Sequence, residues 1–394
     1  MSIFKRYLQT ISIFLFTISF ATYTKAQLSL PFVTKGDLLV VKLSINKVEG
    51  QFIFDTGASN SVIDSVLAVK LGLKADGSNR SASTAGVSSF KYISNQKISL
   101  NEKDEIICKK LIFTNLKSLQ ELVGVEFAGI IGFDILNKYV TKIDYETKTI
   151  SLFTQLDKSE TAMYTAVPFN FNNGIPIPQF DVSFVLNNGE KFTGTILFDT
   201  GAGLILSVNT PFKETHQLSK KIGKTLISQS KDLFKDTKQE SAVIKSITIG
   251  TYTFENLPIQ LTSAKAGVSA YPYYLGLLGN KIINRFNIIV DYANKVIYFK
   301  PNQNFEHPFE FPLSGIRFKK VKNQILIAYI TMGSEAEKLG LKPGQRITAV
   351  DGYTGNDMEE LRKLLLQEGK TIKISAIGAD GKTKDVDLLL KKLL

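Results

Sequence analysis

One short motif occurs twice in this sequence of 394 residues. Phe54-Asp55-Thr56-Gly57-Ala58 recurs 144 residues later as Phe198-Asp199-Thr200-Gly201-Ala202, and each copy follows an apolar, strand-like run. At average residue usage, a given tripeptide such as Asp-Thr-Gly is expected about 0.05 times in a chain of this length. Two copies in matching surroundings therefore indicate two structural units built on one plan.

A second landmark supports the repeat. Gly129-Ile-Ile-Gly132 recurs as Gly276-Leu-Leu-Gly279, 147 residues later, and the register then continues without a gap. The residues that match after this landmark are Asn137 with Asn284, Tyr139 with Phe286, Asp144-Tyr145 with Asp291-Tyr292, and Lys148 with Lys295. The two units, which we call lobe one (27–155) and lobe two (165–300), differ by a three-residue insertion between the landmarks.

Both lobes are predicted to consist mainly of β-strands. Apolar, β-branched runs at 37–45 and 51–54 flank a turn-like segment, and 287–290 and 296–299 flank another, as expected for hairpins. A helix is predicted only at 61–70, apart from short turns after the repeated glycines. The polar segment 154–166 joins the lobes.

The last part of the chain has a different pattern. Residues 301–311 are predicted to be a linker, because the stretch 301–312 contains prolines at 301, 308 and 312. Two strands within 315–330, a helix at 357–367 and closing strands at 372–377 and 384–390 predict a small α+β domain, which we call the C-terminal domain (312–394).

Residues 1–26 have the pattern of a signal peptide. Lys5 and Arg6 precede an apolar stretch at 11–21, and 24–26 fits a small-x-small cleavage site. Spanning a membrane takes about 20 apolar residues, so we expect cleavage and export to the periplasm or cell surface rather than a retained anchor. Cleavage would lower the formal net charge from +12 to +9. The basic residues are scattered, so no nucleic-acid partner is expected.

The residue counts disfavour several classes of hydrolase. One cysteine, Cys108, excludes an intramolecular disulfide, and two histidines without an HExxH-type pattern disfavour a zinc centre. We expect no metal and no cofactor. The 36 Asp and Glu residues therefore remain as the candidate catalytic groups.

The duplicated Asp-Thr-Gly motif resembles that of aspartic peptidases of the pepsin and retropepsin kind, over residues 37–300. The small lobes without disulfides are more similar to bacterial retropepsin-like proteins. The resemblance implies that a two-fold axis brings Asp55 and Asp199 together as the catalytic pair of a monomer. The residues that would support them are Thr56, Gly57, Ala58, Ser59, Thr200, Gly201, Ala202 and the glycines Gly132 and Gly279.

Two carboxylates about 3 Å apart share one proton and can supply a base and an acid together. The hypothesis is an exported aspartic endopeptidase in which the pair activates a water molecule. One alternative is a peptide-binding protein on the same scaffold without activity. Another is that the repeat only duplicates turn residues, since Asp and Gly are common in turns.

The sequence also predicts the positions of a flap, of two further repeated aspartates and of the cysteine. A flap hairpin is expected between the first motif and Gly129, with Thr84, Ala85 and Gly86 as candidates. Asp144 and Asp291 are expected in hairpin turns, and Cys108 is expected as a buried strand residue.

The C-terminal domain resembles the PDZ domains of bacterial envelope proteases. Such domains bind a C-terminal peptide by strand addition and hold its carboxylate on backbone N–H groups. The candidates for this role are Ser314, Gly315, Ile316, Arg317 and Phe318. The expected partners are thus a peptide or protein substrate and a C-terminal peptide. The alternative is that this domain only packs against the lobes.

Overall fold

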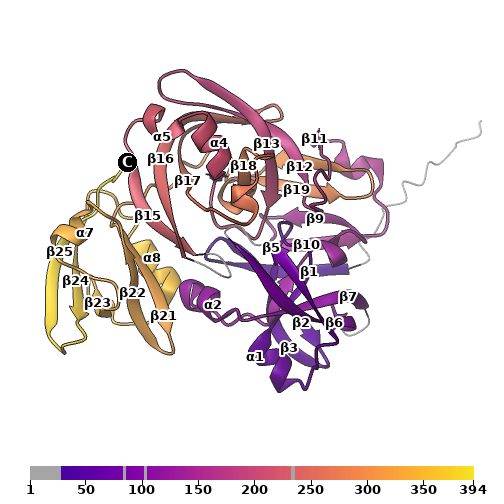
Figure 1. Cartoon of the computed structure of the whole chain (residues 1–394), viewed down its shortest axis with the longest axis horizontal. Coiled ribbons are helices and arrows are strands. Elements are labelled where there is room, and N and C mark those ends of the chain that lie inside the picture. The colour runs from indigo at the N-terminus through magenta and orange to yellow at the C-terminus, as the bar shows by residue number, and fades with distance from the viewer. Residues whose placement is uncertain (1–27, 83–85, 102–103, 232–235) are drawn as a thin grey trace, which may run out of the picture.

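The structure, a computed structural model, describes residues 28–82, 86–101, 104–231 and 236–394. Strands dominate it, which confirms the mainly β prediction, and the described strands form sheets of 13, 7 and 5 strands. Figure 1 shows lobe one in indigo and purple, lobe two in magenta to orange, and the C-terminal domain in yellow beside them. The predicted signal peptide lies outside the described residues. Within the described ranges, no helix is long and apolar enough to cross a membrane.

Lobe one is a set of antiparallel hairpins with three short helices. Its strands are β1 (Leu28–Lys35), β2 (Leu38–Ile45), β3 (Val48–Phe54), β4 (Val62–Asp64), β5 (Gly77–Ala82), β6 (Val87–Ser99), β7 (Glu105–Thr114), β8 (Gly129–Ile131), β9 (Val140–Asp144) and β10 (Thr149–Phe153). Its helices are α1 (Ser65–Lys70), α2 (Lys117–Val123) and α3 (Phe133–Leu136).

Lobe two repeats this order. Its strands are β11 (Thr165–Pro168), β12 (Gln179–Val185), β13 (Lys191–Asp199), β14 (Leu206–Val208), β15 (Leu226–Lys231), β16 (Asp236–Ile249), β17 (Tyr252–Thr262), β18 (Gly276–Gly279), β19 (Phe286–Asp291) and β20 (Val296–Pro301). Its helices are α4 (Thr210–Thr215), α5 (Leu218–Lys221) and α6 (Asn280–Ile283), with a 3-10 turn at Val268–Ala270. Another 3-10 turn, Lys158–Thr161, lies in the segment that joins the lobes.

The two lobes share one topology around the repeated motif. In lobe one, β3 pairs in parallel with β8, which pairs antiparallel with β4, which pairs in parallel with β7. In lobe two, β13, β18, β14 and β17 make the same three pairings. Phe54 lies opposite Ile131 and Phe198 opposite Leu278, so the registers agree as well.

A shared sheet joins the lobes. Strand β9 of lobe one pairs antiparallel with β19 of lobe two, with Ile288 opposite Ile143, and β10, β1, β20 and β11 extend this sheet on both sides. Ile143 and Ile288 have no exposed surface and belong to one apolar core that spans both lobes. Burial of apolar surface, at about 25 cal/mol per Å², therefore stabilises the two lobes as one body.

One predicted helix is shorter than the sequence pattern indicates. The segment 61–70 begins with strand β4, and only 65–70 form helix α1. The carboxylate of Asp64 accepts hydrogen bonds from the N–H groups of Val66 and Leu67, which caps the helix at that point. Val62 and Ile63 are buried β-branched residues, whose stiff side chains favour a strand.

Residues 301–311 lie against lobe two. The buried guanidinium of Arg285 donates hydrogen bonds to the carbonyl oxygens of Asn304, His307 and Pro308 and lies 4.3 Å from the ring centre of Phe309. The rings of Phe305 and Phe309 pack against the core of the lobes. The segment predicted as a linker is therefore held in place by side chains of lobe two.

The C-terminal domain has its own apolar core and a five-stranded sheet. Its strands are β21 (Ile316–Val321), β22 (Gln324–Ile330), β23 (Arg346–Val350), β24 (Thr371–Ile377) and β25 (Thr383–Leu389), paired in chain order, and its helices are α7 (Glu335–Lys338) and α8 (Met358–Leu364). Asp357 caps α8 through the N–H groups of Glu359 and Glu360.

This domain contacts both lobes. Strand β21 packs against helix α2 of lobe one, and β22 packs against β15 of lobe two; Figure 1 shows the yellow sheet next to both elements. The guanidinium of Arg362 donates to the carbonyl oxygen of Leu122, 2.9 Å away, and the carboxylate of Glu359 accepts from the N–H of Gly36. Gly124 lies so close to Met358 that a Cβ there would be 2.4 Å from its Cγ.

We predict that Arg285→Met lowers the free energy of unfolding by about 3 kcal/mol, because three carbonyl groups lose a buried, charged donor. Urea denaturation followed by circular dichroism measures the change. The matched control is Arg346→Met, which removes an exposed arginine and should stay within about 0.5 kcal/mol of the wild type. Equal stability of the two variants would contradict the role assigned to Arg285.

Candidate active site

The two Asp-Thr-Gly motifs occupy equivalent loops at the ends of strands β3 and β13. The N–H of Asp55 donates to the carbonyl oxygen of Ile131 on β8, and Asp199 pairs in the ladder with Gly279 of β18. Each aspartate thus follows a buried strand that is paired in parallel with a second buried strand. This arrangement fixes the backbone positions from which the two aspartate side chains extend.

Reciprocal hydrogen bonds join the two loops. The N–H of Thr56 donates to the hydroxyl of Thr200 and the N–H of Thr200 to the hydroxyl of Thr56, both at 3.0 Å. The two hydroxyls in turn donate to the carbonyl oxygens of Phe198 and Phe54. Both threonines are at most 1% exposed. These buried hydrogen bonds fix the loops relative to each other.

The two aspartates meet between the loops, and their carboxyl groups hydrogen-bond to each other. Gly57 N–H donates to Asp55 Oδ1 at 2.7 Å, and Gly201 N–H donates to Asp199 Oδ1 at 2.8 Å. A Cβ on either glycine would lie 2.2 Å from the carboxyl carbon of the aspartate in the other loop. Only glycine permits this approach, whatever its backbone angles.

Burial and mutual repulsion raise the pKa values of the pair. The pKa of Asp199 is raised well above its ordinary value by desolvation and then by the negative charge of Asp55. Desolvation also raises the pKa of Asp55, while hydrogen bonds from Asp199 and from the N–H groups of Gly57, Ala58 and Gly201 oppose the rise. Asp199 is 8% exposed and Asp55 is half-buried, so solvent reaches the pair from the side of Asp55. The raised pKa values favour a pair that holds one proton between the two carboxyl groups.

The repeated glycines lie behind the loops. A Cβ on Gly132 would be 2.6 Å from the carbonyl oxygen of Ala58, and a Cβ on Gly279 would be 2.6 Å from that of Ala202. The next residues, Phe133 and Asn280, donate their N–H groups to the same two carbonyl oxygens. The repeated glycines and the loops thus pack in the same way in both lobes.

The side chains that support the loops differ between the lobes. In lobe one, Asp134 accepts hydrogen bonds from the N–H and hydroxyl of Ser61 and from the thiol of Cys108, and the Ser61 hydroxyl accepts from Gly132 N–H. Desolvation raises the pKa of Asp134. Cys108 is fully buried in β7, and this thiol contact was not predicted.

In lobe two, Asn280 has the supporting role. Its amide nitrogen donates to the carbonyl oxygen of Asp37 at 2.6 Å, and its Oδ1 accepts from the hydroxyl of Tyr145 at 2.5 Å. The sequence analysis missed Asp134 and Asn280. Each follows a repeated glycine at a position where the two lobes differ, and this difference is the signal that could have identified both.

Tyr292, the repeat partner of Tyr145, is a second sign of asymmetry. Its buried hydroxyl has no hydrogen-bond partner among the described residues. The residue equivalent to Asn280 in lobe one is Phe133, which offers no acceptor, and the ring of Tyr292 packs edge-on against it at 5.5 Å. Burial raises the pKa of Tyr292, and the charge of Asp55 adds to the rise, so this phenol stays protonated close to the pair.

The other predicted residues lie as follows. Ser59 is half-buried, and none of the described hydrogen bonds of Asp55 comes from it. Of the flap candidates, Thr84 and Ala85 lie outside the described residues. Gly86 directly precedes β6, in the hairpin where Ala82 of β5 pairs with Val87. Asp144 and Asp291 accept N–H groups within their own hairpin turns.

The predicted peptide-binding residues of the C-terminal domain fall into two groups. The buried hydroxyl of Ser314 accepts from Ile316 N–H at 3.1 Å, Gly315 has a positive φ of 72° and Phe318 belongs to the apolar core. These residues shape the loop and its strand. Arg317, in contrast, has an exposed side chain.

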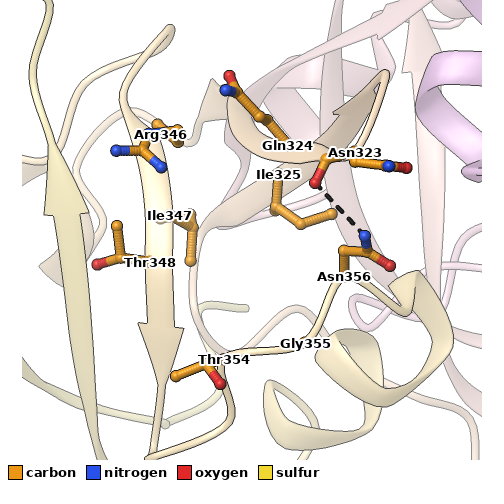
Figure 2. A pocket seen from close by; sticks show the side chains of 9 residues that line it. All are labelled: Asn323, Gln324, Ile325, Arg346, Ile347, Thr348, Thr354, Gly355 and Asn356. Carbon is orange, nitrogen blue, oxygen red and sulfur yellow. Dashed lines mark hydrogen bonds between the residues drawn. The ribbon is translucent and has the colours of Figure 1, made fainter.

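A hollow of about 220 Å³ lies within the C-terminal domain (Figure 2). Its lining combines the turn and start of β22, the start of β23 and the loop at 354–356, and Arg346 is the charged side chain among them. The hollow contains no carboxylate and is separate from the paired aspartates. Nowhere in the described ranges do three or more His, Cys, Asp or Glu side chains form a group that could hold a metal ion.

We predict that Asp199→Asn makes the protein more stable at pH 7 and that the gain grows with pH above about 4. The pKa of Asp199 is raised above the unfolded value of about 3.9. Between these two pKa values the folded state binds more protons than the unfolded state, so wild-type stability falls as pH rises through this window. Asparagine is neutral throughout and can still donate to Asp55.

Thermal unfolding from pH 3 to 8 measures this difference. The control is Asp387→Asn, which removes an exposed carboxylate of β25. A stability difference that does not depend on pH would contradict the shared-proton arrangement.

Comparison with known proteins agrees with this geometry in part of the chain. Residues 41–135 match the sequence model of a family described as aspartyl protease, a range that includes the loop of Asp55 and ends in α3. No curated protein matches the sequence. Among solved structures, the chain is similar to the aspartic proteinase from Irpex lacteus, with 13% sequence identity and a TM-score of 0.45, over 71% of this chain and 98% of that one. The family match thus covers the first loop, and the internal repeat relates the second loop to it.

Proposed function

We propose that this protein is an aspartic-type endopeptidase that hydrolyses peptide bonds with Asp55 and Asp199. The observation that carries the proposal is the pair itself: two carboxyl groups from equivalent loops hydrogen-bond to each other and have raised pKa values. A carboxyl pair that shares one proton supplies a general base and a general acid at one place. The aspartyl protease family match over 41–135 supports the same assignment.

The proposed reaction uses the asymmetry of the pair. Asp55, half-buried and stabilised as an anion by N–H donors, takes a proton from a water molecule, whose oxygen attacks the carbonyl carbon of the peptide bond. Protonated Asp199 donates a hydrogen bond to the carbonyl oxygen as negative charge develops there. Collapse of the tetrahedral intermediate breaks the C–N bond, and the leaving amine takes a proton from the pair. The products are a carboxylic acid and an amine.

The second candidate function is peptide binding without hydrolysis. Such a protein would gain nothing from two buried carboxyl groups that repel each other. Desolvation and repulsion disfavour the ionised pair, and a neutral residue at either position would relieve both. The intact pair therefore favours the peptidase.

Export and a monomeric state belong to the same proposal. The sequence pattern of residues 1–26 supports removal of a signal peptide and a location in the periplasm or at the cell surface. Both loops lie in one chain, so the pair forms without a second subunit. Size-exclusion chromatography with light scattering and N-terminal sequencing of the secreted protein would test these two points.

The C-terminal domain is proposed to bind the C-terminus of a peptide or protein along β21. This strand is at the edge of its sheet, with β22 as its one ladder partner among the described strands, so a peptide could pair along the free edge. The packing of α2 against β21 and the hydrogen bond from Arg362 to Leu122 support the alternative that the domain docks on lobe one. A bound peptide would have to share this edge with α2.

We predict that Asp55→Asn and Asp199→Asn each lower kcat by at least about 1,000-fold, since neither carboxyl group can act alone. The measurement is cleavage of casein and of a peptide library, with cleavage sites mapped by mass spectrometry. Asp144→Asn is the matched control, because Asp144 also repeats but lies in a hairpin turn, and it should retain activity. A tenth of the wild-type kcat in either dyad variant would refute the symmetric assignment, and no cleavage by the wild type would favour the binding protein.

For the C-terminal domain, we predict that the Asp199→Asn full chain binds peptides with a free C-terminal carboxylate at least about tenfold more tightly than the same peptides as amides. Fluorescence anisotropy with labelled peptides of both kinds measures the ratio. Equal or absent binding would indicate that this domain only docks on the lobes.

A further inference from the structure

Arg317 of the C-terminal domain lies between elements of both lobes. It is opposite Tyr329 in the β21–β22 pair, and β22 packs against β15 of lobe two. On the other side, β21 packs against α2 of lobe one and against α8, whose Glu359 accepts a hydrogen bond from the N–H of Gly36, the neighbour of Asp37. Arg317 thus belongs to a strand pair of the C-terminal domain that contacts both lobes.

The turn at Asp37 lies next to the second aspartate loop. A Cβ on Gly203 would be 2.9 Å from the carbonyl oxygen of Gly36 and 3.3 Å from Cβ of Asp37. Gly203 is exposed, and it follows by two residues the glycine whose backbone touches the carboxyl group of Asp55. A peptide that lies across the aspartate pair and continues past Gly203 therefore reaches the turn at 36–37, which is bonded to the C-terminal domain through Glu359.

The charged groups around Arg317 already have partners. The carboxylate of Asp37 is 3.5 Å from Lys281 Nζ, which also pairs with Glu310. Arg362 is paired with Glu359 at 2.6 Å, and both fix the C-terminal domain through Leu122 and Gly36. These contacts fix the backbone position of β21 relative to the aspartate pair without using Arg317.

The charge of Arg317 itself is unmatched. Among the residues that the structure describes, no carboxylate lies within ion-pair distance of its guanidinium, and no hydrogen bond from it is present. Residue 317 is exposed, while partial desolvation and then the positive charge of Arg362 lower the pKa of its guanidinium. An arginine remains protonated under these conditions, so it presents a cation that solvent and ligands can reach.

We propose that Arg317 is a specificity-determining residue that binds a carboxylate group of the peptide substrate beside Gly203. The inference rests on the proposed peptidase function. A guanidinium forms paired hydrogen bonds with a carboxylate, and this geometry suits an Asp or Glu side chain or the C-terminal carboxylate of a short peptide. The enzyme then prefers peptides that place such a group a few residues from the cleaved bond.

The test compares Arg317→Gln with the wild type on matched peptides. One set replaces Asp or Glu by Asn or Gln at each position around the cleavage site, and a second set compares free C-terminal acids with amides. We expect the wild type to prefer one acidic position, or the free acid, by about tenfold in kcat/KM. Arg317→Gln loses this preference through a higher KM, while its kcat/KM for neutral peptides is unchanged. Which set responds identifies the source of the carboxylate.

Two further variants make the test specific. Arg317→Glu should reverse the preference toward peptides with lysine at the same position. Arg346→Gln removes an exposed arginine of the same domain at the hollow in Figure 2 and should leave all preferences unchanged.

The outcomes separate the two proposals. Cleavage by the wild type without any dependence on an acidic group, or an equal loss for neutral and acidic peptides in Arg317→Gln, overturns the inference and leaves the peptidase function standing. The absence of cleavage of every peptide by the wild type overturns both.

Discussion

The contact between the two Asp-Thr-Gly loops is the constraint on which the rest of the site depends. Each loop donates a backbone N–H to the other loop's threonine hydroxyl, and each glycine accommodates the other loop's carboxyl group. Placing two carboxyl groups next to each other in a buried site costs free energy, because both lose solvent and their charges repel each other. The shared sheet through β9 and β19 and the continuous core offset this cost by joining the lobes into one body.

The fold is nearly symmetric, but the chemistry is not. Equivalent strands place equivalent aspartates, whereas the groups behind them differ: Asp134 with Ser61 in lobe one, and Asn280 with Tyr145 in lobe two. Asp199 is more buried than Asp55, and its pKa is raised further. Duplication of a motif therefore yields two different carboxyl groups, as acid–base chemistry requires, because each lobe supplies its own surroundings.

The C-terminal domain is part of the same body rather than a separate module on a free linker. Arg285 holds the segment at 301–311 against lobe two, and Arg362 joins α8 to α2 across 240 residues of sequence. The Gly36–Asp37 turn contacts this domain on one side and the loop of Asp199 on the other. This turn thus links α8 of the C-terminal domain to the loop of Asp199.

The sequence by itself determined the repeat, the mainly β class and the two loops, because strands and turns follow from neighbouring residues and the motif occurs twice in register. It did not determine where α1 begins, because the carboxylate of Asp64 and the strand pairing of Val62 set that boundary. Only the tertiary structure decided the contacts of Asp134 and Asn280 and the surroundings of Arg317. Each depends on contacts between distant segments, and a polar side chain in the sequence gives no sign of whether it will face solvent, a buried loop or another domain.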